Sequence, residues 1–242
     1  MTGRVLVLAG TAMAREVCAA VADRDVVASL AGRTERPESY AVAVRVGGFG
    51  GERGLAAALD GVAAVLDATH PFAAGITASA LAACAARGVP YLRLVQPGWE
   101  REPGWFRHAD AEAAAAALPT GARVLLATGP GTVDAFLHRD LHIWCRRIDP
   151  APRRAGVTWI VGRPPFAEVE ERALLRRIAA THLVTKDSGG PRGKLDAAAA
   201  LGVAVHVIAR PPAPAGEETH DPSRAIAFVR AHAAPLPHHR DR

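Results

Sequence analysis

The strongest constraint on the fold is a regular alternation of short apolar segments with alanine-rich segments along nearly all of the 242 residues. The apolar segments have the length of buried strands, about four to eight residues, and the segments between them are long enough for one helix each. Strands that alternate with helices form parallel sheets with helices on both faces. The sequence therefore predicts an α/β protein.

The expected strands cover residues 4–8, 26–30, 40–46, 63–67, 91–95, 123–127, 141–148, 182–185 and 203–208. The expected helices cover residues 12–22, 52–60, 71–87, 108–118, 132–138, 166–180, 194–201 and 223–233. The best break in this pattern is the Pro-Thr-Gly at 119–121. We therefore expect two Rossmann-like halves, residues 1–119 and 120–242, with an active-site cleft between them.

Composition narrows the class of partner. Half of the chain is apolar, 22% is charged, and the formal net charge is +5, which is typical of a globular protein that receives an anionic ligand. Lysine and arginine are spread out rather than gathered in a stripe, which argues against nucleic-acid binding. No run is long enough to span a membrane. The Arg4–Ala14 segment could pass as a short signal peptide, but it suits a strand, a turn and a helix better.

The three cysteines, Cys18, Cys84 and Cys145, lie far apart and in no metal-binding spacing. We expect them to be reduced structural thiols in a protein of the cytoplasm. The sequence predicts no metal site. It does not fix the oligomeric state, for which a monomer is favoured.

Two phrases each follow a predicted strand of the first half. Gly47, Gly48, Phe49 and Gly50 open a loop with four glycines in five residues, and Asp67–Phe72 reads Asp-Ala-Thr-His-Pro-Phe. In an open parallel sheet, ligands bind at the carboxyl ends of the strands. A glycine-rich loop leaves backbone amides uncovered, so a phosphate or a flat ring can approach them. The two phrases therefore predict a cofactor site.

The roles within Asp67–Phe72 are open. His70 could contact the cofactor, act as an acid or bind a metal, although no second and third ligand stand at metal spacing. Asp67 could cap the turn amides rather than take part in chemistry.

Two further residue groups point to a dinucleotide. Gly10 and Thr11 follow the first strand, where the amides of a helix N-terminus can hold a pyrophosphate, although the full G-x-G-x-x-G pattern is absent. Arg33 follows the second strand, where NADP-binding folds place an arginine on the 2′-phosphate. Arg36 is a second candidate for that task. These positions predict NADPH.

In the second half, Lys186 ends a predicted strand and is followed by Asp187, Ser188, Gly189 and Gly190. The lysine could donate a proton or hold an anion, and Ser-Gly-Gly could form an anion-binding turn. Arg146 and Arg147 lie in an apolar strand, where an unpaired arginine would cost several kcal/mol. One of this pair is therefore expected to face an anion or a carboxylate.

Together these residues resemble the precorrin-6A reductase family of cobalamin biosynthesis. The resemblance covers residues 6–210, and the phrases that carry it are Leu8–Thr11, Ala31–Arg33, Gly47–Gly51, Asp67–Phe72, Tyr91–Leu94, Arg146–Pro150, Arg163–Phe166, Lys186–Gly190 and Arg210–Pro211. The chain departs from the family pattern at Ala9, where glycine is common, and at Asp187, where asparagine is common.

The resemblance implies that a nicotinamide cofactor reduces one ring double bond of the tetrapyrrole precorrin-6A, giving precorrin-6B. On this reading Lys186 supplies the proton, although water could do so instead. The expected cofactor-binding residues are Gly10, Thr11, Arg33, Gly47, Gly48, Phe49, Gly50, Asp67, Thr69 and His70. The expected substrate-binding residues are Pro71, Phe72, Arg146, Asp187, Ser188, Gly189 and Arg210.

Three other functions compete with this one. A cobalt-precorrin-6A reductase would act on the metallated ring, with NADH as an alternative cofactor. A non-catalytic dinucleotide-binding protein would keep the glycine loop without needing Lys186. A short-chain-type dehydrogenase would need a Tyr-x-x-x-Lys pair, and neither Tyr40 nor Tyr91 has lysine four residues later.

Overall fold

The computed structural model describes residues 2–32, 38–212 and 214–237. The chain forms two compact units, one made of residues 1–96 with 212–242 and the other of residues 97–211. This division differs from the boundary expected at 119 and 120. The segment just before 119 packs with the sheet that follows it, and the end of the chain packs with the first sheet.

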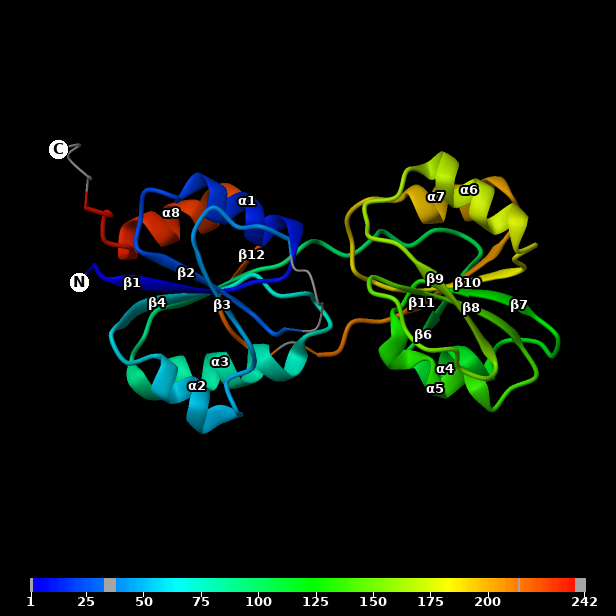
Figure 1. Ribbon diagram of the computed structural model, residues 1–242, viewed down its shortest axis with the longest axis horizontal. Helices are drawn as coiled ribbons and strands as arrows, with labels where there is room; N and C mark the ends of the chain where they lie inside the picture. Colours follow the sequence, from blue (N-terminus) through cyan, green and yellow to red (C-terminus); the bar gives the residue numbers. More distant parts are fainter. Residues whose placement is uncertain (1, 33–37, 213, 238–242) are drawn as a thin grey trace. The chain divides into compact units, whose positions relative to one another are not determined.

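The first unit contains a six-stranded, fully parallel sheet (Figure 1). Its order is β3 (Ala43–Val46), β2 (Val26–Leu30), β1 (Arg4–Leu8), β4 (Val62–Asp67), β5 (Tyr91–Leu94) and β12 (Glu218–Thr219). Helices α1 (Ala12–Ala20) and α8 (Pro222–His232) cover one face, and α2 (Glu52–Ala58) and α3 (Ala74–Arg87) cover the other. This is the strand order of the doubly wound dinucleotide-binding sheet.

Packing on both faces explains why β1 is apolar from Val5 to Leu8. Val5 and Val7 belong to the core under α1 and α8, whereas Leu6 and Leu8 belong to the core with α2 and α3. Successive side chains of a strand point to opposite faces, so a strand covered on both sides must be apolar at every position.

The second unit repeats the plan. Its order is β9 (Val157–Val161), β8 (His142–Arg147), β7 (Arg123–Leu126), β10 (His182–Lys186), β11 (Ala204–Ile208) and β6 (Trp105–His108), again all parallel. Helices α4 (Ala111–Ala116) and α5 (Asp134–Leu137) cover one face, and α6 (Glu168–Arg177) and α7 (Gly193–Ala200) cover the other (Figure 1). A short 3-10 turn, Pro130–Thr132, precedes α5.

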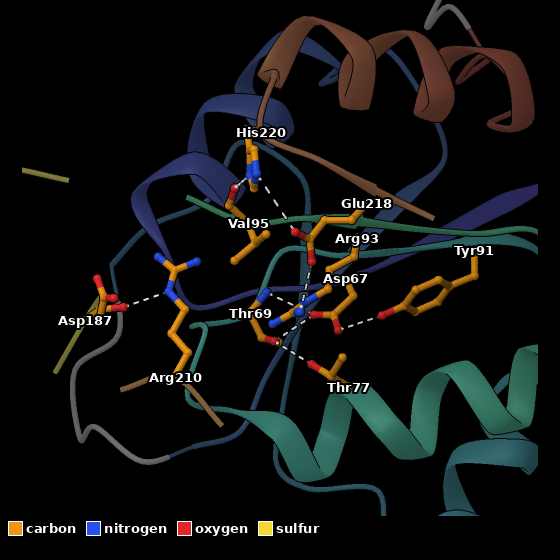
Figure 2. Close-up of polar contacts among 10 residues, drawn as sticks. All are labelled: Asp67, Thr69, Thr77, Tyr91, Arg93, Val95, Asp187, Arg210, Glu218 and His220. Atoms are coloured by element: carbon orange, nitrogen blue, oxygen red, sulfur yellow. Dashed lines mark hydrogen bonds and ion pairs between the residues drawn. The ribbon is translucent and has the colours of Figure 1, made fainter. Parts of the chain in front are cut away.

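The sixth strand of each sheet is not the one expected from chain order. β12 reaches the first sheet after the chain has completed the second unit, and β6 joins the second sheet although it precedes β7. β12 is fixed to β5 by an ion pair between the buried Arg93 and the exposed Glu218, in which Arg93 Nη1 lies 3.0 Å from Glu218 Oε2 (Figure 2). The sequence pattern did not predict β6, β9 or β12.

No helix in the described part of the chain is long and apolar enough to cross a membrane.

Candidate active site

In the first sheet the strand order reverses between β1 and β4, which places the ligand-binding edge at the ends of these two strands. Thr11 joins the two ends, because its hydroxyl donates to the carbonyl of Ala68 (2.8 Å) and accepts from the amide of Ala14 (3.1 Å). The second contact makes Thr11 the N-cap of α1. The Gly10 amide donates to the Tyr40 hydroxyl at 3.1 Å. The turn after β1 is thus held in a fixed position.

The glycine loop follows β3, and the Arg45 side chain holds the backbone of the loop in place. This side chain donates to the carbonyls of Gly47 (3.1 Å) and Gly48 (3.2 Å), and its guanidinium carbon lies 4.1 Å from the centre of the Phe49 ring. Gly47 and Gly50 have φ values of +119° and +75°, which favour glycine. A Cβ added at any of Gly47, Gly48, Gly50 or Gly51 would meet no atom within 4 Å. The backbone of the loop is therefore open to a ligand.

Arg45 was missed by the sequence analysis. Its position two residues before the first glycine, in an exposed edge strand, could have indicated that it contacts the loop.

Asp67 ends β4 and is fully buried. Its Oδ1 accepts from the amide (3.0 Å) and the hydroxyl (2.7 Å) of Thr69, and its Oδ2 accepts from the Tyr91 hydroxyl at 2.9 Å (Figure 2). Burial, aided by the charge of Asp67, raises the pKa of Tyr91, so the phenol remains a donor. Both carboxylate oxygens serve internal donors, which favours the capping role for Asp67 over direct chemistry.

The residues after Thr69 form the turn that leads to α3. His70 is exposed, and its Nδ1 accepts from the amide of Phe72 at 3.2 Å. Pro71 is buried and Phe72 is half-buried. The helix begins at Ala74 rather than at Pro71. This arrangement leaves His70 as the most accessible side chain of the phrase.

In the second unit, residues 186–190 form a loop at the end of β10, which we call the Lys186 loop. Asp187 is 5% exposed and accepts from the Trp99 amide (3.0 Å) and from Arg107 Nη2 (2.7 Å). Its carbonyl accepts from Arg210 Nε at 2.7 Å (Figure 2). The structure therefore brings Lys186, Asp187 and Arg210 together at one sheet edge, together with Ser188 and Gly189 of the loop.

Arg146 forms an ion pair with a residue of the protein itself. Its two terminal nitrogens bind the two carboxylate oxygens of Glu171 on α6, at 2.6 and 2.5 Å, and its guanidinium stacks on Phe166. The expectation that one arginine of the pair faces a carboxylate is confirmed. The carboxylate is that of Glu171, so both terminal nitrogens of Arg146 already serve an internal ion pair, and its assignment to the substrate stays a prediction.

Lys194 lies near this ion pair, with its ammonium 4.5 Å from the centre of a Trp99 ring. Burial lowers the pKa of Lys194 to about 8, against the opposing effect of Glu171. Sequence reasoning missed the partners Glu171, Trp99 and Arg107 because each lies far along the chain from the residue that it contacts.

The remaining residues singled out in the sequence are two arginines and three cysteines. Arg33 and Arg36 lie outside the described residues. Cys18, Cys84 and Cys145 are buried free thiols, and burial raises the pKa of each to about 11. Among the described residues, no group of three or more His, Cys, Asp or Glu side chains could hold a metal ion.

Three histidines, His108, His182 and His206, lie together on neighbouring strands of the second sheet. His206 is 2% exposed, its Nδ1 lies 2.9 Å from Nε2 of His108, and its ring centre lies 5.3 Å from that of His182. The Nε2 of His206 has no hydrogen-bond partner within the described residues. Burial, followed by the charges of His108 and His182, lowers the pKa of His206 to about 4. Protonation of His206 therefore opposes folding.

Since the pKa of His206 is lower in the folded than in the unfolded chain, this stability is complete above the ordinary value of 6.5 and is lost as the pH falls to about 4. We expect the free energy of unfolding to fall by about 3 kcal/mol across this window. Urea titrations at several pH values would measure it. His206→Leu should flatten the dependence, whereas His142→Leu, at an exposed position, should not. Equal slopes in the two variants would contradict the assignment.

Comparison with known proteins places these features in a family. The family described as "Precorrin-6x reductase CbiJ/CobK" matches residues 4–230. The precorrin-6A reductase of Rhodococcus erythropolis is 45% identical over 240 residues, covering 93% of this chain and 97% of its own. The corresponding protein of Mycobacterium tuberculosis is 42% identical over 224 residues, covering 88% and 91%.

A more distant relative, the cobalt-precorrin-6A reductase of Synechocystis, is 34% identical over 188 residues and covers 71% of this chain and 72% of its own. A solved structure, "CobK precorrin-6A reductase", superposes with a TM-score of 0.90 at 38% identity, covering 97% of this chain and 98% of its own. The chain therefore belongs to the precorrin-6x reductase family.

Proposed function

We propose that this protein catalyses the NADPH-dependent reduction of precorrin-6A to precorrin-6B in cobalamin biosynthesis, as a cytoplasmic monomer. The observation that carries the proposal is the open glycine loop on the same doubly wound sheet as the fixed turn at Thr11. Family membership supports the reaction, because relatives that match most of this chain are named precorrin-6A reductases.

The first unit has a donor set that fits a dinucleotide. The amides at the N-terminus of α1, capped by Thr11, suit a pyrophosphate. The glycine loop, with no atom within 4 Å of any added Cβ at Gly47, Gly48, Gly50 or Gly51, suits close approach of a flat ring. Asp67 and Thr69 keep the turn that carries His70 in place. We assign the 2′-phosphate, and hence the choice of NADPH over NADH, to Arg33 from its place after β2.

The second unit offers the basic groups that a polycarboxylate tetrapyrrole needs. Lys186 ends β10 and is followed by Asp187, whose carbonyl accepts from Arg210 at the end of the neighbouring strand β11. When bound, the nicotinamide supplies a hydride. We assign to Lys186 Nζ the proton that the neighbouring ring carbon must receive, since an ammonium at a strand end can serve as a general acid.

The proposal is tested by turnover. Purified protein is mixed with precorrin-6A and either NADPH or NADH, while nicotinamide absorbance and the tetrapyrrole spectrum are followed. We expect NADPH oxidation matched by a spectral change of the macrocycle, and a preference for NADPH that is lost in Arg33→Ser. Activity confined to the cobalt-containing ring would instead assign the protein the reaction for which its more distant relative is named, the reduction of cobalt-precorrin-6A. Absence of dinucleotide binding would contradict the assignments at Thr11, Arg33 and the glycine loop.

A further inference from the structure

We propose that Trp99, acting through Asp187 and Gly190, and Arg107, acting through Asp187, are positioning residues that hold the Lys186 loop in its working conformation. This inference rests on the proposed function, because its kinetic consequence concerns the reduction assigned above. Neither residue carries a motif of its own, and both come from the segment that precedes and forms the edge strand β6.

The Asp187 side chain is held by two donors. The Trp99 amide binds Oδ1 at 3.0 Å and Arg107 Nη2 binds Oδ2 at 2.7 Å. The Asp187 side chain is 7% exposed, so these contacts are little weakened by solvent, and charge-assisted bonds are the stronger kind. The Asp187 amide meanwhile donates to the Ile208 carbonyl at 2.9 Å. Asp187 therefore anchors the backbone directly after Lys186.

Trp99 also holds the far end of the Lys186 loop. Its indole Nε1 donates to the carbonyl of Gly190 at 3.0 Å. Between these anchors, Gly189 and Gly190 have φ values of +70° and +77°. Two consecutive glycines lose much conformational freedom when they are ordered, so the loop depends on contacts from outside itself. One residue, Trp99, supplies such contacts at both ends.

Gly98 packs closely against the Asp187 carboxylate. A Cβ on Gly98 would lie 3.2 and 3.3 Å from the two oxygens of Asp187. Gly98 does not have a positive φ among the described glycines, so the close approach, rather than the backbone conformation, favours glycine here. Gly98→Ala would thus displace Asp187 while every bonding partner stays present.

The test compares four variants with the wild-type protein. Trp99→Phe removes only the indole donor, Arg107→Leu removes the ion pair, and Arg107→Lys restores a cation. Arg123→Leu is the matched control, because Arg123 is an arginine of the same unit that stacks on Trp144 and binds the carbonyls of Ile178 and Ala179, away from the Lys186 loop.

We expect Trp99→Phe and Arg107→Leu to lower kcat about tenfold to a hundredfold, as small misplacements of reacting groups do, with an unchanged Kd for NADPH. Arg107→Lys should recover part of the loss. Arg123→Leu should lower the Tm and leave kcat unchanged. Wild-type kcat in both Trp99→Phe and Arg107→Leu, or an equal loss in Arg123→Leu, would overturn the proposal.

Hydrogen exchange of the amides of residues 186–190 decides the positioning role without reference to activity. Faster exchange in Trp99→Phe and Arg107→Leu, but not in Arg123→Leu, is expected. Unchanged exchange would overturn the proposal even if the enzyme turns over precorrin-6A. Failure of the wild-type protein to reduce precorrin-6A would instead contradict the proposed function, and the exchange result would still stand.

Discussion

Glu171→Leu is expected to lower the free energy of unfolding by about 3–5 kcal/mol, the usual cost of leaving one partner of a buried ion pair alone. The side chains of Glu171 and Arg146 are 3% and 13% exposed, and they meet through two bonds of 2.5 and 2.6 Å. Glu171 also offsets the buried charge of Lys194. Its loss would leave two cations in the interior of the second unit. Urea denaturation at pH 7, followed by circular dichroism, measures the effect.

Two further variants make this prediction specific. The double variant Arg146→Met/Glu171→Leu should recover most of the lost stability, because both charges are removed together. Glu168→Gln breaks an exposed pair with Arg172 on the same helix and should change the free energy of unfolding by no more than about 0.5 kcal/mol. If the single Glu171 variant were as stable as Glu168→Gln, the ion pair would not hold the unit together.

Lys186→Met is expected to lower kcat by about 10²- to 10⁴-fold, the range associated with loss of a general acid. The side chain ends β10 next to the anchored Asp187, so its removal should alter proton delivery without unfolding the loop. Single-turnover measurements with precorrin-6A and NADPH, together with the Kd of NADPH, would separate this loss from a loss of cofactor binding.

The chain offers a natural control, because Lys186 and Lys194 are the only lysines in the sequence. Lys194→Met removes the other ammonium, and we expect it to lower kcat much less than Lys186→Met does. Nearly normal turnover in Lys186→Met would assign the proton to water instead.

The interior strands and the edge strand β3 could be predicted from the sequence, whereas the edge strands β6, β9 and β12 could not. β1 and β2 are covered on both faces and appear as mostly apolar runs. β6 and β12 contain charged or exposed residues and are only four and two residues long. Their place in the sheets depends on strand order, which periodicity does not encode.

The same distinction applies to the site. The glycine loop and the phrase that begins at Asp67 are local, so their residue types indicate their place at strand ends. The partners of Asp187 lie 80 and 88 residues away in the sequence, and the partner of Arg146 lies 25 residues away. A buried arginine indicates that a partner must exist, but only the packing of α6 identifies it as Glu171.

Because β12 comes late in the chain, the first sheet can be completed only after the second unit has been synthesised. The second unit is one continuous stretch, residues 97–211, whereas the first unit needs both ends of the chain. Leu94 pairs with Thr219, so at ribosomal speeds of about 5–20 residues per second β5 waits roughly 6–25 s for its neighbour. During that time the edge of β5 lacks its neighbouring strand while the second unit is still being made. The nascent chain is therefore most open to chaperones, and to aggregation, at β5.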